Sequence, residues 1–131
     1  HIVITVGGGG IPVIDTGNGN LKGVPAVIDK DFASCKIAEL INADLLVVLT
    51  AVEQVAINFG KSNQKNLSRI TVEEVKTYIK EGQFAPGSML PKIKAALIFV
   101  EAKEGRKAII TSLEKAKDAI REVAGTIICV S

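Results

Sequence analysis

The 131-residue sequence has few of the residue types that metal sites and nucleophilic triads require. It contains one histidine, at position 1, two cysteines and no tryptophan. Cys35 and Cys129 lie far apart, and neither belongs to a CxxC or Cys/His cluster, so no structural zinc site is indicated. A single histidine also argues against a histidine-based triad. We expect both cysteines to be buried free thiols in a reducing compartment, the cytoplasm.

The sequence also lacks a strong excess of one charge and any long apolar run. Its formal net charge is +2, from 16 Lys and Arg against 14 Asp and Glu. A nucleic-acid-binding domain would show clustered Lys and Arg. No apolar run approaches the roughly 18–20 residues that a membrane span needs, and HIVITV has no charged n-region of a signal peptide. We therefore expect neither a nucleic acid nor a membrane as a partner.

Short apolar runs alternate with helical patterns along the chain. Strands are predicted at residues 2–6, 44–50, 52–58, 107–112 and 125–130, and helices at 29–43, 72–82, 91–103 and 113–124. The run at 2–6 is expected to be a buried parallel strand, and the run at 44–50 a central one. This alternation predicts an α/β fold, a three-layer αβα sandwich with an open, mainly parallel sheet. Ligands of such sheets bind beyond the carboxyl ends of the strands.

Two glycine patterns invite a phosphate-binding interpretation. Gly7–Gly10 follows the first predicted strand, where glycines let the backbone approach an anion, although a flexible surface turn is the alternative. The run is not a dinucleotide fingerprint, because Pro12 stands where the last glycine would be. The GKS at 60–62 fails as a P-loop, because Val55 stands where its first glycine would be. Phe59 either anchors the core or a loop, or stacks on an adenine ring.

Two predicted helices carry a lysine at their N-terminus, Lys30 in IDKD and Lys92 in GQFAPGSMLPK. Positive charge at that end of a helix costs about 0.3–1 kcal/mol. The cost is offset if a phosphate occupies the free N–H groups, and phosphoryl transfer requires positive charge on the transferring group. Asp31 could hold the two lysines apart and in line. The alternative, that both lysines are simply exposed, stays open.

Five segments resemble the carbamate kinases of the amino acid kinase family. They occur in the family's order and cover almost the whole chain: GGGGIPV, GVPAVIDKDFAS, ADLLVVLTAVEQVAINFG, GQFAPGSMLPK and AIITSLEKA. The resemblance implies interconversion of carbamate and MgATP with carbamoyl phosphate and ADP, as part of arginine metabolism. It also implies an open αβα sandwich, a homodimer, and Mg²⁺ that accompanies ATP or ADP.

The resemblance also implies a role for each site residue. Lys92 would stabilise the transferring phosphoryl group, Asp31 would orient the catalytic lysines, and Lys30 would be a further phosphate contact. The residues expected to bind ATP are Thr50, Ala51, Val52, Gly87, Ser88, Met89 and Lys92. The loop Gly7, Gly8, Gly9 and Gly10 would lie near the phosphoryl or carbamate end.

The chain departs from the family in two respects. Residues 1–131 correspond to the C-terminal, nucleotide-binding part, and the N-terminal part, with another catalytic lysine and much of the carbamate pocket, is absent. Turnover would then require a companion N-terminal segment. Ala51 also stands where many amino acid kinases have an aspartate. Two alternatives remain, another amino acid kinase of the acetylglutamate, glutamate or uridylate type, and a noncatalytic nucleotide-binding module.

Overall fold

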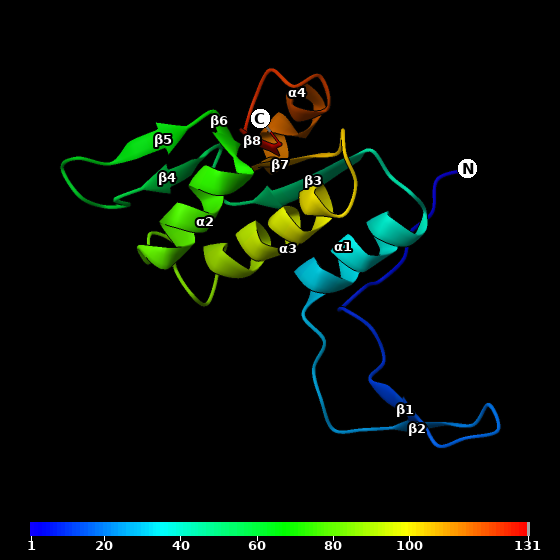
Figure 1. Ribbon diagram of the computed structural model, residues 1–131. Coiled ribbons are helices and arrows are strands. Elements are labelled where there is room, and N and C mark those ends of the chain that lie inside the picture. Colours follow the sequence, from blue (N-terminus) through cyan, green and yellow to red (C-terminus); the bar gives the residue numbers. More distant parts are fainter. Residues whose placement is uncertain (131) are drawn as a thin grey trace.

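A four-stranded sheet forms the middle layer of the computed structural model, which describes residues 1–130 (Figure 1). Its strands, in spatial order, are β3 (Leu45–Thr50), β7 (Lys107–Ser112), β8 (Thr126–Cys129) and β6 (Arg69–Thr71). β3 pairs with β7 and β6 pairs with β8 in parallel, whereas β7 and β8 are antiparallel. The sheet is therefore mixed and mainly parallel, as predicted.

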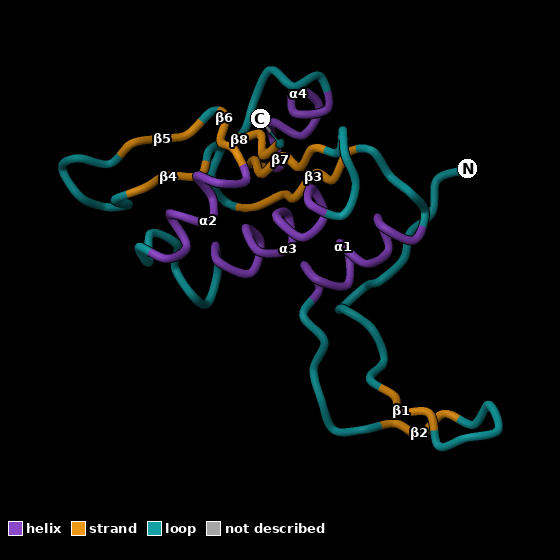
Figure 2. The backbone as a smooth tube through the Cα atoms, viewed as in Figure 1, coloured by secondary structure: helices purple, strands orange, loops and turns teal. Residues whose placement is uncertain are grey.

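Helices cover both faces of this sheet. On one face lie α1 (Lys30–Leu40), α2 (Val72–Lys80) and α3 (Met89–Glu101), and on the other lie the 3₁₀ turn η1 (Leu113–Lys115) and α4 (Ala116–Ile120). Figure 2 shows the three longer helices below the strands and α4 above them. The predicted three-layer arrangement is confirmed, although the expected helix at 113–124 is broken into two short pieces.

The predicted helix caps form as the sequence indicates. Asp29 Oδ1 accepts hydrogen bonds from the N–H groups of Asp31, at 2.8 Å, and Phe32, at 3.4 Å. At the start of α2, Thr71 Oγ1 accepts from the Glu74 N–H at 3.2 Å, and Glu74 Oε2 accepts from the Thr71 N–H at 2.8 Å. These bonds satisfy N–H groups that the first helical turn leaves without partners, so α1 and α2 begin where expected.

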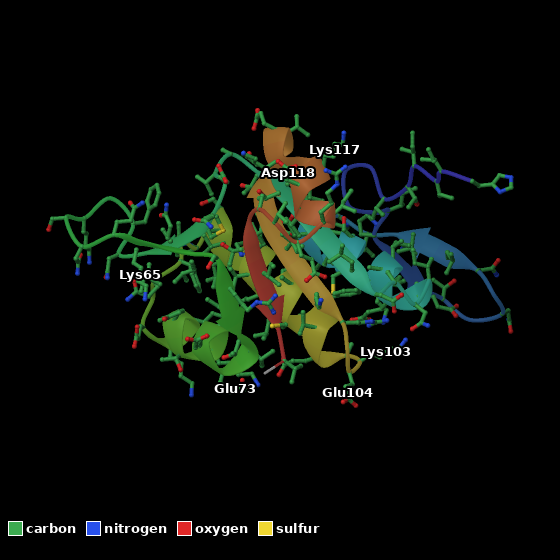
Figure 3. All side chains as sticks on the ribbon, turned by 90° about the horizontal axis from the view of Figure 1, so that it is seen from above. Lys65, Glu73, Lys103, Glu104, Lys117 and Asp118 are labelled. Atoms are coloured by element: carbon green, nitrogen blue, oxygen red, sulfur yellow. The ribbon has the colours of Figure 1, made fainter. Side chains whose placement is uncertain are left out.

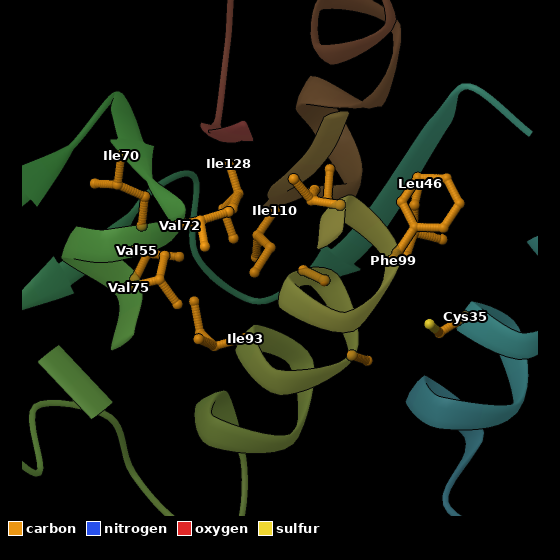
Figure 4. Close-up of a cluster of buried hydrophobic side chains, with 14 of the residues drawn as sticks. Cys35, Leu46, Val55, Ile70, Val72, Val75, Ile93, Phe99, Ile110 and Ile128 are labelled. Atoms are coloured by element: carbon orange, nitrogen blue, oxygen red, sulfur yellow. The ribbon is translucent and has the colours of Figure 1, made fainter. Parts of the chain in front are cut away.

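The main hydrophobic core lies between the sheet and helices α1–α3. α3 occupies the middle of its layer, packed against both α1 and α2, and it buries residues on several sides: Ile93, Ala95, Ala96, Phe99 and Val100. Figure 4 shows Phe99 beside Leu46 of β3, and Ile93 directed toward the other end of the core. A smaller cluster of Ile109, Ala119 and Ile127 fills the space under α4.

Two antiparallel hairpins extend from this body. One joins β1 (Val13–Asp15) to β2 (Leu21–Gly23), and it projects well away from the sheet (Figure 1). The other joins β4 (Val55–Ile57) to β5 (Lys65–Leu67). β4 confirms the short strand predicted within 52–58, whereas β1, β2 and β5 fall in stretches that the sequence predicts as loops.

Two expectations about the strands are wrong, and the direction of a third strand was not predicted. Residues 2–6 form no strand, and Ile2, Val3 and Ile4 are 76–98% exposed, because no described residue pairs with them in a sheet. Within residues 1–130, β3 pairs with β7 alone, so it is an edge strand and not the central strand that was expected. β8 runs antiparallel to β7, entering at Gly125, where a Cβ would lie 2.9 Å from the Ile110 carbonyl oxygen. An apolar run indicates buried faces, and it does not report how many strands lie beside it.

The two cysteines differ in their surroundings. Cys35 in α1 is 3% exposed, and burial, followed by the nearby Glu39, raises the pKa of its thiol to about 11. Cys129 is only half-buried, and Arg69 Nη1 lies 3.3 Å from its sulfur. Both are free thiols in the described chain, so the expectation of burial is confirmed for Cys35 alone.

One cation is buried while the other charged side chains reach solvent. Figure 3 shows Lys65, Glu73 and Lys117 at the periphery, and all three are exposed. Arg106, in contrast, is 5% exposed, with its guanidinium 4.6 Å from the centre of the Phe99 ring. Its Nε donates to the Ala43 carbonyl at 3.0 Å. Arg106 thus ties the chain that leaves α1 to the end of α3.

Replacing Arg106 tests this tie. We expect Arg106→Met to lower the free energy of unfolding by about 2–3 kcal/mol, because the Ala43 carbonyl loses its donor and Phe99 loses a stacked cation. Urea unfolding measures the change. Lys36→Met serves as the control, since it removes an exposed pair with Glu39 that contributes about 0.5 kcal/mol or less. Equal losses in the two variants would show that Arg106 does not hold these segments together.

Candidate functional site

Three ends of secondary structure meet at one edge of the sheet. α1 is followed by a short turn and then by β3, which runs in the opposite direction, so the start of α1 lies near the carboxyl end of β3. α3 also begins at this edge (Figure 1). A position beyond the carboxyl end of a parallel strand is where open α/β sheets bind their ligands.

A cavity of about 220 Å³ lies beyond the end of β3. Two groups of residues predicted for the nucleotide site line it together, Thr50–Ala51–Val52 from the end of β3 and Ser88–Met89 from the start of α3. Gly87 and Lys92, predicted for the same site, are not among its lining residues. The structure therefore brings two distant sequence motifs to the walls of one cavity.

Other residues complete the walls of this cavity. Phe59 lines it from the turn after β4, and it is 69% exposed, which leaves its ring accessible at the mouth. Gln54, Gln83, Phe84 and Ala85 also line it, although sequence reasoning did not assign them to the site. All four fall within the quoted segments ADLLVVLTAVEQVAINFG and GQFAPGSMLPK, and this proximity was the available signal.

Lys92 and Asp31 form a partly buried ion pair beside the cavity. Lys92 Nζ lies 2.9 Å from Asp31 Oδ2 and 3.2 Å from Oδ1, and the two side chains are 15% and 13% exposed. The bond joins the first turn of α3 to the first turn of α1. Lys30, in contrast, is exposed and makes no hydrogen bond or ion pair within residues 1–130. Asp31 thus holds one of the two predicted lysines, not both.

The N-terminus of α3 has no side-chain cap. Ser88 makes no capping hydrogen bond, the first turn contains no acidic residue, and Pro91 has no N–H group. At α1, by comparison, Asp29 already accepts from two of the first N–H groups. The Leu90 N–H already donates to the Ala85 carbonyl at 3.0 Å, so the uncapped end of α3 keeps the Met89 N–H and the positive end of the helix dipole available to an anion.

The glycine run lies against the residues that lead into α1. A Cβ on Gly9, where φ is +133°, would lie 2.1 Å from the Ile28 carbonyl oxygen and 3.5 Å from the Lys30 nitrogen. Only glycine fits so close to another backbone. Gly7–Gly10 therefore lies near the start of α1, even though the strand predicted before it does not form, and its placement near the phosphoryl or carbamate end stays a prediction.

No metal-binding cluster accompanies these groups. Among residues 1–130, no group of three or more His, Cys, Asp or Glu side chains could hold a metal ion. No helix within the same range is long and apolar enough to cross a membrane. At this edge of the sheet, a ligand would meet an apolar cavity, an uncapped helix end and lysine side chains.

Such an arrangement suits a ligand that is anionic at one end and planar and apolar at the other. The mainly parallel sheet with helices on both faces and a cavity beyond the end of β3 places the chain in the class of α/β proteins with a ligand cavity at the carboxyl ends of the strands. The family model named amino acid kinase family matches residues 1–112. Since the match covers most of the sequence, the chain belongs to the amino acid kinase family.

Several relatives are carbamate kinases or are named after them. The chain is 58% identical over 125 residues, 95% of its length, to the carbamate kinase of Clostridium perfringens. It is 57% identical over 129 residues, 98% of its length, to the carbamate kinase-like protein YqeA of Escherichia coli. It spans 40% and 41% of the lengths of these two proteins.

A solved structure shares the fold of almost the whole chain. The carbamate kinase from Giardia lamblia bound to AMP-PNP superimposes with a TM-score of 0.88 at 43% sequence identity. The match covers 95% of this chain and 39% of that one. The likeness therefore applies to a part of the carbamate kinase fold that has the length of this chain.

The ion pair at the site can be tested by a double-mutant cycle. We expect Asp31→Asn to lower the free energy of unfolding by about 2–3 kcal/mol, because it leaves the partly buried Lys92 ammonium without its partner. Adding Lys92→Met removes that charge, so the double variant should lose less than the sum of the single losses, with a coupling of at least about 1 kcal/mol.

The control cycle uses the exposed pair between Lys76 and Glu101, whose atoms lie 2.6 Å apart with side chains 48% and 41% exposed. Its coupling should be about 0.5 kcal/mol or less, because solvent screens it. A coupling between Asp31 and Lys92 no larger than this would contradict the assignment of a tight, partly buried pair.

Proposed function

We propose that this chain is the nucleotide-binding part of an ATP:carbamate phosphotransferase, which interconverts carbamoyl phosphate and ADP with carbamate and ATP. The observation that carries the proposal is the Lys92–Asp31 pair at the uncapped start of α3, next to the cavity at the end of β3. The identity of 58% to a carbamate kinase supports the choice of reaction.

The cavity and the start of α3 bind different parts of the nucleotide. The adenine ring enters the apolar cavity, where the exposed Phe59 ring is available for stacking. The phosphates extend toward Gly87, Ser88 and Met89, because the Met89 N–H and the positive end of the α3 dipole attract anions. The AMP-PNP bound by the Giardia lamblia carbamate kinase supports a nucleotide as the ligand.

Lys92 acts on the phosphoryl group that is transferred. In the direction of ATP formation, the bond between phosphorus and the carbamoyl oxygen breaks, and a bond forms between phosphorus and a terminal oxygen of ADP. The electron pair of the broken bond leaves with carbamate, and the step needs no proton. Lys92 stabilises the charge on the phosphoryl oxygens, Asp31 keeps its ammonium in place, and the unpaired Lys30 adds a second positive charge.

Mg²⁺ would arrive with the nucleotide. No cluster of three or more potential ligands occurs within residues 1–130, which does not suit a resident metal ion. Mg²⁺ is bound through few protein carboxylates and through substrate phosphates in most phosphoryl-transfer sites. We therefore treat MgADP and MgATP as the substrates, and assign no residue of this chain to the metal.

The acceptor site requires a further segment. The chain spans 40% of the length of the Clostridium perfringens enzyme. Ile2, Val3 and Ile4 are exposed, and one edge of β3 has no partner strand within residues 1–130, so the chain offers both apolar surface and backbone hydrogen bonds to another segment. By its likeness to the carbamate kinases, the complete protein would be a cytoplasmic homodimer of arginine metabolism.

A noncatalytic nucleotide-binding module is the second candidate. The name carbamate kinase-like, given to the relative that is 57% identical, states a likeness and no reaction. Another amino acid kinase would use the same phosphate groups with a different acceptor. The identity of 54–58% to several carbamate kinases favours carbamate over the acetylglutamate, glutamate and uridylate kinases.

A chimeric enzyme separates these candidates. These 131 residues replace the matching segment of the Clostridium perfringens carbamate kinase, and a coupled assay follows ATP formation from carbamoyl phosphate and MgADP. We expect activity from the chimera and none from the 131-residue chain alone, which should still bind ADP. ADP binding without turnover in the chimera would favour the noncatalytic module. Consumption of MgATP in the presence of N-acetylglutamate or UMP would instead favour another amino acid kinase.

The role of Lys92 is tested in the same chimera. Lys92→Ala should lower kcat at least about 100-fold, because a single positioned donor of positive charge is lost from the transition state. Lys94→Ala is the matched control, since Lys94 is exposed on the same helix and lies outside the site. It should leave kcat unchanged. A similar kcat for Lys92→Ala and the unmodified chimera would rule out the catalytic assignment.

A further inference from the structure

Gln83 connects the two walls of the cavity. Its backbone N–H donates to the Tyr78 carbonyl at 3.0 Å, which fixes it to the end of α2. Its side chain crosses to the opposite wall, where Oε1 accepts a hydrogen bond from the Asn58 N–H at 2.9 Å. Gln83 also lines the cavity itself. The length of this bond is normal for an N–H group that donates to an amide oxygen, and the bond is partly shielded from water.

Asn58 begins the turn that carries Phe59. It lies just past the last paired residues of the β4–β5 hairpin, Ile57 and Lys65, so its N–H has no partner in that ladder. Its φ of 53° is in the left-handed region, which asparagine tolerates better than most residues. Such a conformation persists where the surroundings fix it, and Gln83 supplies that constraint.

The two walls differ in how firmly they are held. On the wall of Gln83, Phe84 is 4% exposed and packs edge to face against Tyr78, with ring centres 6.4 Å apart. On the opposite wall, the tip of the hairpin at 58–64 is mostly exposed. Within residues 1–130, the Asn58–Gln83 bond is the one hydrogen bond that joins this tip to the loop at 82–88.

The amide of Gln83 is oriented by a second bond. Its Nε2 donates to Glu81 Oε2 at 3.3 Å, which leaves Oε1 directed at Asn58. The tip has its own internal bond as well, from the Gly60 N–H to Gln64 Oε1 at 2.9 Å. Gln64 therefore closes the hairpin on itself, whereas Gln83 ties the hairpin to the rest of the site.

We propose that Gln83 is a positioning residue of the nucleotide site. By holding the Asn58 turn, it keeps the Phe59 ring at a set distance from Ala85 and Met89, so that the cavity accepts the planar base of a nucleoside diphosphate. It governs the affinity for the nucleotide and leaves the transfer step to Lys92. The proposal rests on the proposed nucleotide site and goes beyond it by assigning what sets the width of the cavity.

ADP binding to the 131-residue chain tests the proposal, since the whole cavity lies within it. Gln83→Met has a similar size but no acceptor for the Asn58 N–H, and it should raise the Kd for ADP about tenfold. Exchanging both side chains, with Gln83→Glu and Glu81→Gln, keeps an acceptor at 83 and a donor at 81. This double variant should bind ADP nearly as well as the original chain.

Two further measurements separate positioning from general stability. Amide hydrogen exchange at Asn58 should be faster in Gln83→Met and return to its original rate in the double variant. Gln64→Met, which loses two hydrogen bonds within the β4–β5 hairpin, to Gly60 and Asn66, should leave the Kd for ADP unchanged. In the chimeric enzyme, Gln83→Met should raise the KM for ADP while kcat stays the same.

Each outcome decides the question. An unchanged Kd for Gln83→Met, together with faster exchange at Asn58, overturns the assignment of Gln83 and leaves the nucleotide site intact. If the original chain does not bind ADP, the nucleotide site is overturned and the inference with it. Should Gln83→Met fail to fold, Gln83→Asn replaces it, because its amide is one methylene too short to reach Asn58, and the same rise in Kd is expected.

Discussion

Two opposite charges with little exposure to water, on Asp31 and Lys92, determine how the site is put together. Removing a carboxylate and an ammonium from water is costly, and their attraction offsets that cost only at short range. The 2.9 Å bond therefore requires the first turns of α1 and α3 to lie side by side. That arrangement places the glycine run, which packs against the start of α1, at the same edge as the cavity beyond β3.

Features that depend on neighbouring residues were predictable from the sequence. Asp29 and the pair Thr71 and Glu74 act within one helical turn, so the starts of α1 and α2 follow from local chemistry. The strand β7 has the bounds that its apolar run indicates. Lys92 was recognisable as a site residue because a lysine in a first helical turn contradicts the helix dipole, and such a contradiction needs a compensating group.

Features that depend on distant partners were not predictable in the same way. The run at 2–6 has the composition of a strand, yet a strand also needs a neighbour, and none lies among the described residues. The antiparallel direction of β8 is defined by its pairing with β7, which is distant along the chain, and Gly125 allows the two backbones to approach. The role of Gln83 depends on its hydrogen bond with Asn58, 25 residues away along the chain, and neither local sequence predicts that bond.

Helices α1 and α3 are joined at both ends. The Asp31–Lys92 ion pair joins their first turns, and Arg106 joins the chain after α1 to the end of α3. Two helices that are joined at one end can rotate away from each other, whereas two helices that are joined at both ends move as one rigid body. The tip of the β4–β5 hairpin is held less firmly, since it is exposed and, within residues 1–130, the Asn58–Gln83 bond is its one hydrogen bond to the loop at 82–88. A nucleotide would enter and leave by displacement of that hairpin, on the nanosecond to microsecond timescale of loops, while the phosphate-binding end stays rigid.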